Sequence, residues 1–225
     1  MMPSTSMMSS TSPSFSYRSP VYEKAPLTLN TMSPAIKNTL DAWLKYGTVF
    51  LIYRLCSYFF LETDPDAVLF DECSLRLVLL ILVGFTIYYL LVDPFITFKF
   101  KHPIIQNIFS DTMTFGTVLI SSHLMETYIS GGNYFDMEWL KTAGIILIAF
   151  ATYRVFVNPF IPLETMGPTA NPIISDWAQF GTFLIAFRLL RGQSVLDQKW
   201  ILSVLFALLG FTGYHLITEK LILIQ

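Results

Sequence analysis

The sequence predicts an all-α polytopic membrane protein with about six transmembrane helices, arranged as three repeated two-helix hairpins. Hydrophobic residues make up 53% of the chain and charged residues 13%, whereas an average soluble domain is roughly 25% charged. Six apolar stretches follow one another after a polar start, and similar residue patterns return in alternate stretches. Together these observations favour a bundle of membrane-spanning helices.

The chain changes character near residue 33. Residues 1–33 are rich in Ser, Thr, Pro and Met and show no apolar periodicity, so we expect a disordered or extended tail. An arm that becomes ordered against a partner is the alternative. The six candidate spans beyond the tail are 38–61, 75–98, 104–129, 138–161, 173–191 and 199–223. Each is close to the roughly 20 residues that a helix needs to cross a bilayer.

The even spans share a pattern of a small residue followed four positions later by tyrosine. It reads "GFTIYYLLVDPFI", "AFATYRVFVNPFI" and "GFTGYHLITEKLI". The two positions share one helix face, and small residues on such a face let helices approach closely in lipid. We therefore assign helix packing to Gly84 and Tyr88, Ala149 and Tyr153, and Gly210 and Tyr214. In the first two copies, Pro94 and Pro159 lack an amide hydrogen, so Asp93 and Asn158 are expected to mark helix ends.

The odd spans share a second pattern, "KYGTVFLIYRL", "TFGTVLISSHL" and "QFGTFLIAFRL". Its glycines, which we also assign to helix packing, are Gly47, Gly116 and Gly181. They recur about every 65 to 69 residues, and an aspartate lies five or six residues before each. This period predicts hairpins over 34–98, 99–162 and 163–225.

A basic residue follows each of these glycines by seven positions: Arg54, His123 and Arg188. Seven residues are two helical turns, which places each basic side chain near the far end of its span. We expect Arg54 and Arg188 to lie at the far interface and pair with acidic groups or headgroups, and His123 to be a polar packing residue. A cationic ring that binds an anion is the alternative, and it requires all three to face a common centre.

The sequence carries no P-loop, GxGxxG, HExxH, GxSxG or CxxC motif, and its three histidines lack a metal-ligand spacing. We therefore expect no enzyme activity, no cofactor and no metal. The net charge of -2 argues against a nucleic-acid partner. A slight excess of lysine on the side of the two termini favours both ends facing the cytoplasm.

The Ser/Pro-rich tail, the segment "SPAIKNTLDAWLKYGTVFLIYRL" and the ending "LFALLGFTGYHLI" resemble small multi-span membrane proteins of large icosahedral DNA viruses with an internal lipid membrane. The resemblance implies a location in a virion inner membrane or another virus-associated membrane. We therefore expect a non-enzymatic structural protein whose tail contacts a neighbouring protein such as the capsid. Its expected partners are the lipid bilayer and neighbouring membrane or capsid proteins, in a homo- or hetero-oligomer.

Two other functions remain open at this stage. A channel or small-solute transporter is suggested by the internal repeats and by the third span, where Asp111, Thr114, Thr117 and Ser121 fall near one helical stripe. The same stripe is also explained by hydroxyl groups that bond to backbone between packed helices. The third possibility is an accessory subunit of an organellar membrane complex.

Overall fold

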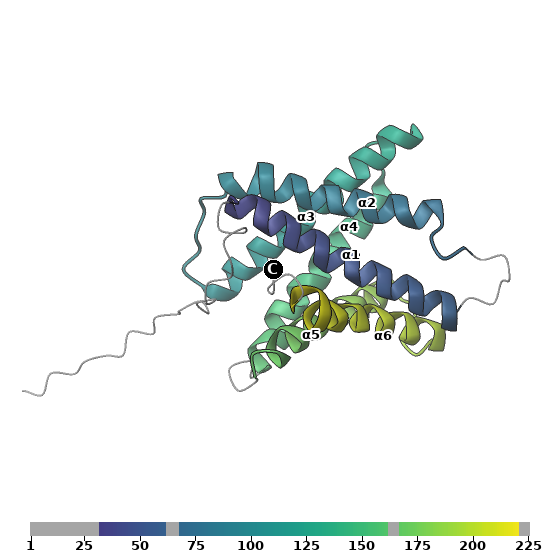
Figure 1. The fold of residues 1–225 in the computed structure, drawn as a ribbon. Coiled ribbons are helices and arrows are strands. Elements are labelled where there is room, and N and C mark those ends of the chain that lie inside the picture. The colour runs from purple at the N-terminus through teal and green to yellow at the C-terminus, as the bar shows by residue number, and fades with distance from the viewer. Residues whose placement is uncertain (1–31, 62–67, 162–166, 221–225) are drawn as a thin grey trace, which may run out of the picture.

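The computed structural model describes residues 32–61, 68–161 and 167–220, and within them every regular element is helical (Figure 1). The predicted tail, apart from its last two residues, and the end of the sixth predicted span lie outside the described residues. The α-helices are α1 (Pro34–Phe60), α2 (Glu72–Ile87), α3 (Pro103–Ser130), α4 (Met137–Thr152), α5 (Ala170–Leu190) and α6 (Gln198–Gly213). The all-helical class and the positions of the six predicted helices are thus confirmed.

Four of the helices, taken with the short turns that extend them, are long and apolar enough to cross a membrane. They are Glu72–Phe95, Met137–Phe160, Ala170–Leu190 and Gln198–Thr218. Large apolar side chains along them stay exposed, among them Leu79, Ile148 and Leu209, and an apolar helix that is not covered by protein is typical of contact with lipid. Helices α1 and α3 are not in this group because ionic and polar residues interrupt them.

The three even helices begin and end in the same way. Asp71, Asp136 and Asp197 cap their first turns, each accepting a hydrogen bond from a backbone amide, which an N-cap aspartate does well. Each helix then passes into a five-residue π-helical turn that starts at the tyrosine of the repeated pattern. These turns are η1 (Tyr88–Val92), η3 (Tyr153–Val157) and η6 (Tyr214–Thr218).

Short 3-10 turns follow two of the π turns and finish their helices. They are η2 (Asp93–Phe95) and η4 (Asn158–Phe160), and the backbone becomes extended at Ile96 and Ile161. The helical turns thus end at Phe95 and Phe160, two residues beyond the ends predicted at Asp93 and Asn158. The prolines that follow have no amide hydrogen to donate to the helix.

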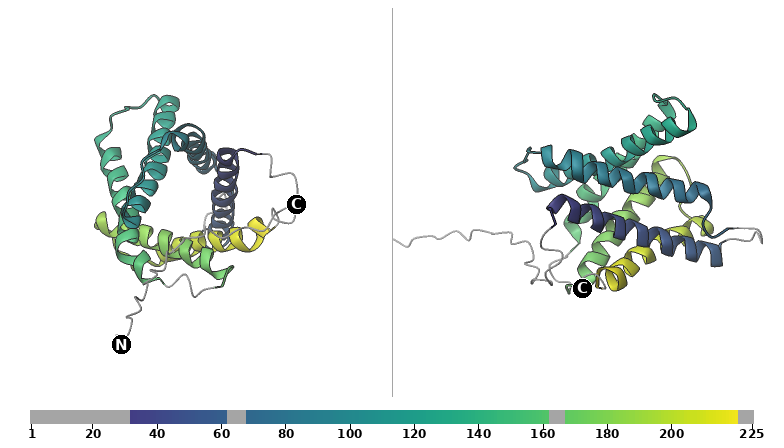
Figure 2. Two further views of the ribbon diagram at one scale, coloured as in Figure 1. Left: turned by 90° about the vertical axis from the view of Figure 1, so that its left-hand side faces the viewer. Right: turned by 45° about the horizontal axis from the view of Figure 1, so that its top comes forward.

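The six helices form a closed ring in chain order, because α6 packs against α1 (Figure 2, left). Contact is most extensive between α1 and α6 and between α2 and α3, and less so within each hairpin. Inside two hairpins, a tryptophan ties the helices together: the Nε1 of Trp43 donates to the Leu82 carbonyl at 3.0 Å, and that of Trp177 donates to the Leu208 carbonyl at 3.0 Å. The ring thus depends mainly on contacts between successive hairpins.

Two glycines of the even helices lie at these close contacts. A Cβ on Gly210 would lie 2.7 Å from the Cα of Val49 in α1, and one on Gly84 would lie 3.0 Å from the Cα of Val118 in α3. Ala149 holds the corresponding place in α4 and is fully buried. The close neighbours of Gly84 and Gly210 agree with the packing role assigned to the small residues of the even helices.

The glycines of the odd helices differ from this. A Cβ on Gly47, Gly116 or Gly181 would meet no heavy atom within 4 Å. The described residues therefore show no close helix contact at these three glycines to support the packing role assigned to them. The pattern in the odd helices is instead explained by the aromatic residue directly before each glycine.

Those aromatic residues fill the centre of the ring. The core contains six rings, one from each helix: Tyr46, Phe85, Phe115, Phe150, Phe180 and Phe211. Within each hairpin the two rings stack face to face, with centroid distances of 4.4, 4.0 and 4.4 Å in chain order. Neighbouring hairpins meet edge to face at 6.2 Å, 5.9 Å and, from the third back to the first, 6.4 Å. Stacked and edge-to-face pairs each stabilise a fold by about 0.5–1.5 kcal/mol beyond their buried area.

The close contact at Gly210 yields a direct test of the ring. We expect Gly210→Ala to lower the free energy of unfolding by about 1–3 kcal/mol, because the backbone of α1 must move to admit a methyl group. Gly181→Ala is the matched control, expected to leave stability unchanged or to raise it, since alanine favours a helix over glycine by about 1 kcal/mol. Thermal unfolding of both variants in one detergent measures the difference. Equal melting temperatures would contradict the close approach of α6 to α1.

Candidate functional site: a buried layer of paired charges

A layer of ionic groups lies one helical turn from the aromatic core, toward the end of the bundle where α1 begins. It is set by the residues four positions before the core aromatics of the odd helices: Ala42, Asp111 and Asp176. Residues four apart share a helix face, so these side chains point inward like the aromatic rings above them. In this layer Asp176 and His215 are buried, and Lys45, Asp111 and Arg154 are partly buried.

Asp176 of α5 holds the largest cluster and is 6% exposed. Its Oδ2 lies 2.7 Å from the Nζ of Lys45 in α1 and 2.8 Å from the Nε2 of His215 in η6. The Nδ1 of His215 lies 2.8 Å from the Oε2 of Glu219, one turn further on. The four residues form a continuous chain that joins the first and third hairpins.

The contacts of His215 favour its protonated form. Both ring nitrogens face carboxylate oxygens, and a neutral imidazole has one N–H donor whereas the imidazolium has two. The cation is therefore the form that satisfies both contacts. With His215 protonated, Lys45 and His215 together balance the charges of Asp176 and Glu219.

Asp111 of α3 is paired within the second hairpin. Its two carboxylate oxygens accept hydrogen bonds from the Nε and Nη2 of Arg154 in η3, at 2.6 and 2.9 Å. This bidentate arrangement matches the planar guanidinium to the carboxylate and is the strongest geometry for such a pair. Arg154 directly follows the tyrosine that opens its π turn, as His215 does in the third hairpin.

The first hairpin carries an apolar version of the same arrangement. Ala42 stands where the other hairpins have Asp111 and Asp176, and Tyr89 stands where they have Arg154 and His215. Ala42 is buried against Phe85 and Val118, with Tyr46 and Tyr89 packed around them. The aspartate of this hairpin, Asp41, is shifted by one residue and accepts a hydrogen bond from the hydroxyl of Tyr214 in η6.

The three pattern tyrosines are buried just beside this layer. Tyr88, Tyr153 and Tyr214 are each less than 5% exposed. The hydroxyls of the first two contact the residue five positions on, at 3.4 Å for Asp93 and 3.2 Å for Asn158. The tyrosines therefore join the π turns to the residues near which two of the helices end.

The predicted water-lining stripe of α3 is occupied by local hydrogen bonds. The hydroxyl of Thr114 donates to the Ser110 carbonyl at 2.9 Å, and that of Ser121 donates to the Thr117 carbonyl at 2.7 Å. Asp111 is bound to Arg154. Three of the four polar side chains of the stripe therefore have partners within the bundle, as expected of hydroxyl residues between packed helices.

The basic residues seven positions after the odd-helix glycines lie at the opposite end of the bundle and do not converge. Arg54 Nη2 is 2.9 Å from Asp71, the N-cap of α2, and Arg54 also donates to the carbonyls of Val68 and Leu69. Arg188 Nη2 is 3.1 Å from Asp197, the N-cap of α6. The pairing with acidic groups that the sequence predicts for the two arginines is thus present.

His123 occupies the third of these positions and has no acidic partner among the described residues. Its ring stacks on Trp139 with a centroid distance of 4.1 Å, and its Nε2 lies 3.3 Å from the Tyr134 carbonyl. Each of the three basic residues therefore binds the loop of its own hairpin. A common cationic ring would need them to face one centre, which this placement does not provide.

Among the described residues, no group of three or more His, Cys, Asp or Glu side chains is arranged to hold a metal ion. No protein-family model, curated protein or solved structure matches this chain.

Sequence reasoning missed the basic partners in this layer. These partners are far in sequence from the carboxylates that they bind: Lys45, Arg154 and His215 are separated from them by 131, 43 and 39 residues. Arg154 and His215 also lie near the start of a π turn. A signal was present in the aspartates five residues before Gly116 and Gly181. Their counterparts become visible once the residue after each pattern tyrosine is compared across the three hairpins.

The apolar pair of the first hairpin provides the control for testing the ionic pair of the second. We expect Asp111→Ala to lower the free energy of unfolding by about 3–5 kcal/mol, because it leaves the Arg154 cation buried and unpaired. The double variant Asp111→Ala with Arg154→Tyr copies Ala42 and Tyr89 and should recover most of that loss. Thermal unfolding in detergent measures both. A double variant no more stable than Asp111→Ala alone would show that the two positions are not coupled.

Asp71 supplies a pH test at the far end of the bundle. Hydrogen bonds from the side chain and backbone of Ser74 lower the pKa of the Asp71 carboxyl below its ordinary value. A carboxyl whose pKa is lower in the folded state stabilises the fold above the unfolded pKa, and this contribution is lost as the pH falls. Wild-type protein should therefore be more stable than Asp71→Asn at pH 7, and the difference should shrink below about pH 4.

Asp136→Asn is the matched control for Asp71→Asn. Asp136 also caps its helix, but it accepts from the Glu138 amide and so lacks both the Ser74 hydrogen bonds of Asp71 and an arginine partner like Arg54 among the described residues. A smaller loss of stability at pH 7 is expected for this variant. Melting temperatures recorded from pH 7 to pH 3 make the comparison, and a pH-independent gap between wild type and Asp71→Asn would contradict the assignment.

Proposed function

We propose that the chain is a non-enzymatic structural protein of a membrane, in which all six helices cross the bilayer as three repeated hairpins. The observation that carries this proposal is the closed interior. Six aromatic rings fill the centre, and the ionic groups beside them are paired with one another. Such an interior favours a fixed scaffold over a path for solutes.

The direction of the chain supports crossings by α1 and α3 as well. Helices α2 and α4 both begin at the end of the bundle where Arg54 and His123 bind the loops, and both run toward the opposite end (Figure 1). Helix α3 must return the chain between them, so if α2 and α4 cross the membrane, α3 crosses it too. Its charged residue at mid-depth, Asp111, is neutralised by Arg154 inside the bundle, and Lys45 of α1 is neutralised in the same way by Asp176. Buried pairing lowers the cost of placing these residues at membrane depth.

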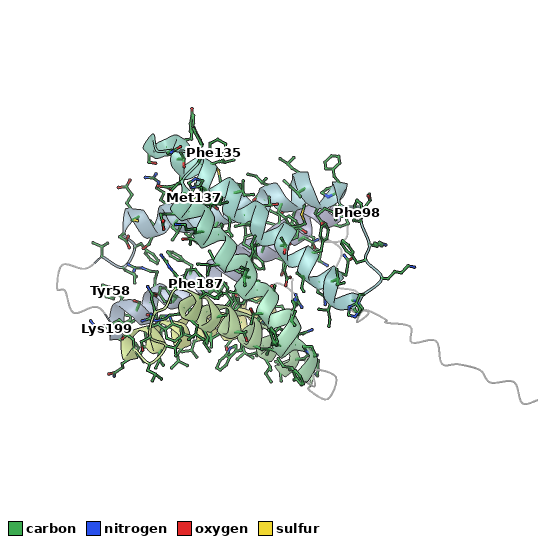
Figure 3. The ribbon with its side chains drawn as sticks, turned by 180° about the vertical axis from the view of Figure 1, so that it is seen from behind. Tyr58, Phe98, Phe135, Met137, Phe187 and Lys199 are labelled. Carbon is green, nitrogen blue, oxygen red and sulfur yellow. The ribbon has the colours of Figure 1, made fainter. Side chains whose placement is uncertain are left out.

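The two ends of the bundle have the character of interfaces. Exposed aromatic and apolar residues gather at the tip between α3 and α4, where Figure 3 labels Phe135 and Met137. At the opposite end Phe98 is exposed directly before Lys99. Aromatic residues and lysines are frequent where a protein meets the headgroups. We propose that the Phe98 end, where α1 begins and η6 ends, faces the cytoplasm.

The location in a virion inner membrane rests on the resemblance of the tail and of two helical segments to viral membrane proteins. In that setting the bundle would be held in the lipid, and the tail would contact a neighbouring protein such as the capsid. Copy number in purified particles is the property to measure. A structural component should be present at a constant ratio to the major capsid protein, whereas an incidental one should vary between preparations.

One observation favours a second function, proton-linked transport. The chain from Lys45 through Asp176 and His215 to Glu219 is a row of ionisable groups at membrane depth, and such groups often form proton relays. The scaffold remains the better supported function because each member of the row has a partner and the aromatic core lies directly beside it.

Two measurements on the full chain test the proposal. The protein should stay in the pellet after carbonate extraction of membranes, and recovery in the supernatant would refute the membrane assignment. Reconstituted into vesicles with a pH gradient, it should give the same proton leak as empty vesicles. A leak that wild-type protein adds and Asp176→Asn removes would instead establish the transport function.

A further inference from the structure

The outer surface of the bundle carries a groove beside the first two turns of α2, at the far end. Its volume is about 540 Å³, within the range of roughly 300–1,000 Å³ that small-molecule sites occupy. It lies between α2 and the end of α3. The residues that line it are Phe70, Glu72, Leu75, Arg76, Leu79, Leu80, Val83 and Ile129.

The greater part of the groove is an apolar stripe that runs along the helix axis. Leu75, Leu79 and Val83 are spaced four residues apart, and each is between 36% and 54% exposed. Eight residues of helix extend about 12 Å, so the stripe has the length of a good part of an acyl chain. Ile129 of α3, 59% exposed, forms the opposite wall. If α2 crosses the membrane, the stripe lies alongside the lipid chains.

The outer end of the groove is polar and contains the cation of Arg76 with the carboxylates of Glu72 and Glu126 near it. The Nη2 of Arg76 donates to the Oε1 of Glu126 in α3 at 2.6 Å, and Glu72 lines the groove one turn before Arg76. The Nε of Arg76 is buried and has no hydrogen-bond partner among the described residues. A buried donor without an acceptor is costly, but this atom is closed to a ligand outside the bundle. The Arg76 side chain as a whole is 36% exposed, so an external acceptor would meet the exposed part of its guanidinium.

We propose that this groove binds one phospholipid with a phosphoethanolamine headgroup. A phosphate oxygen accepts a hydrogen bond from the exposed part of the Arg76 guanidinium, the ammonium group donates to Glu72 and Glu126, and one acyl chain lies along Leu75, Leu79 and Val83. The proposal rests on the membrane location given above, but not on the structural role or on the viral setting.

The charges at the headgroup end select among the common phospholipids. Two carboxylates against one guanidinium leave the site net negative, which disfavours a headgroup that carries a net negative charge. A quaternary choline has no N–H to donate, whereas a primary ammonium has three donors for carboxylates. Hydrogen bonds between ionised groups are about twice as strong as neutral ones. Ethanolamine therefore fits both the charge and the donors that the groove requires.

Native mass spectrometry of the full chain in detergent tests the site. Phosphatidylethanolamine, phosphatidylcholine and phosphatidylglycerol with identical acyl chains are titrated separately. We expect one ethanolamine lipid to bind about tenfold more tightly than either of the others, which corresponds to about 1.4 kcal/mol. Arg76→Gln should lower its affinity by a similar factor. Arg191→Gln, which removes an exposed arginine that lies over Phe187 at the same end of the bundle, is the matched control and should bind as wild type does.

A second variant keeps the proposal testable even if Arg76→Gln fails to fold. Glu126→Gln removes one carboxylate and leaves Arg76 in place, so it should shift the preference from ethanolamine toward the anionic glycerol headgroup. A purely structural role for Glu126 would weaken binding of all three lipids equally or not at all. Equal binding of the three lipids by wild-type protein, or an unchanged preference in Glu126→Gln, would overturn the proposal. Carbonate extraction, measured separately, reports whether the membrane assignment itself fails.

Discussion

The stacked aromatic rings at the centre are the interaction on which the rest of this structure depends. Helices in lipid gain little from hydrophobic association, because lipid tails are as apolar as their side chains. Close packing must therefore come from shape and from specific contacts. Each hairpin contributes one face-to-face pair, and the edge of each pair meets the face of the next. This pattern fixes the order of the hairpins and closes α6 onto α1.

The position of the ionic layer follows from the position of the aromatic core. The residue one turn before each odd-helix aromatic must point inward, so whatever stands there is removed from both lipid and water. An alanine fits without further requirement, as at Ala42. An aspartate requires a cation close by, and the two hairpins that carry one obtain it differently: Arg154 comes from the same hairpin, whereas Lys45 comes from the neighbouring one. The Lys45–Asp176 ion pair links the first hairpin to the third, which are also the hairpins joined by the close packing of α6 on α1.

Much of the fold could be predicted from the sequence, because apolar runs and capping residues are local signals. The helices, their ends near Asp93 and Asn158, and the separate placement of Arg54 and Arg188 all depend on residues close together in the chain. The candidate site was less accessible. His215 reads as an isolated histidine in an apolar span, and its partners Asp176 and Lys45 come from other helices. The role of the odd-helix glycines was also uncertain from spacing alone, since a glycine that permits close packing looks the same as one that merely follows a core aromatic residue.

The π turns have a geometric consequence for the length of the even helices. In an α-helix, residues five positions apart lie on different faces, since each residue turns the chain by about 100°. In a π turn, hydrogen bonds join residues five apart and bring them onto one side. This is why the hydroxyls of Tyr88 and Tyr153 reach Asp93 and Asn158. Loss of one residue within such a turn would restore regular backbone hydrogen bonding and yet separate the hydroxyl from its acceptor, so a side chain as well as the backbone sets how many residues these segments contain.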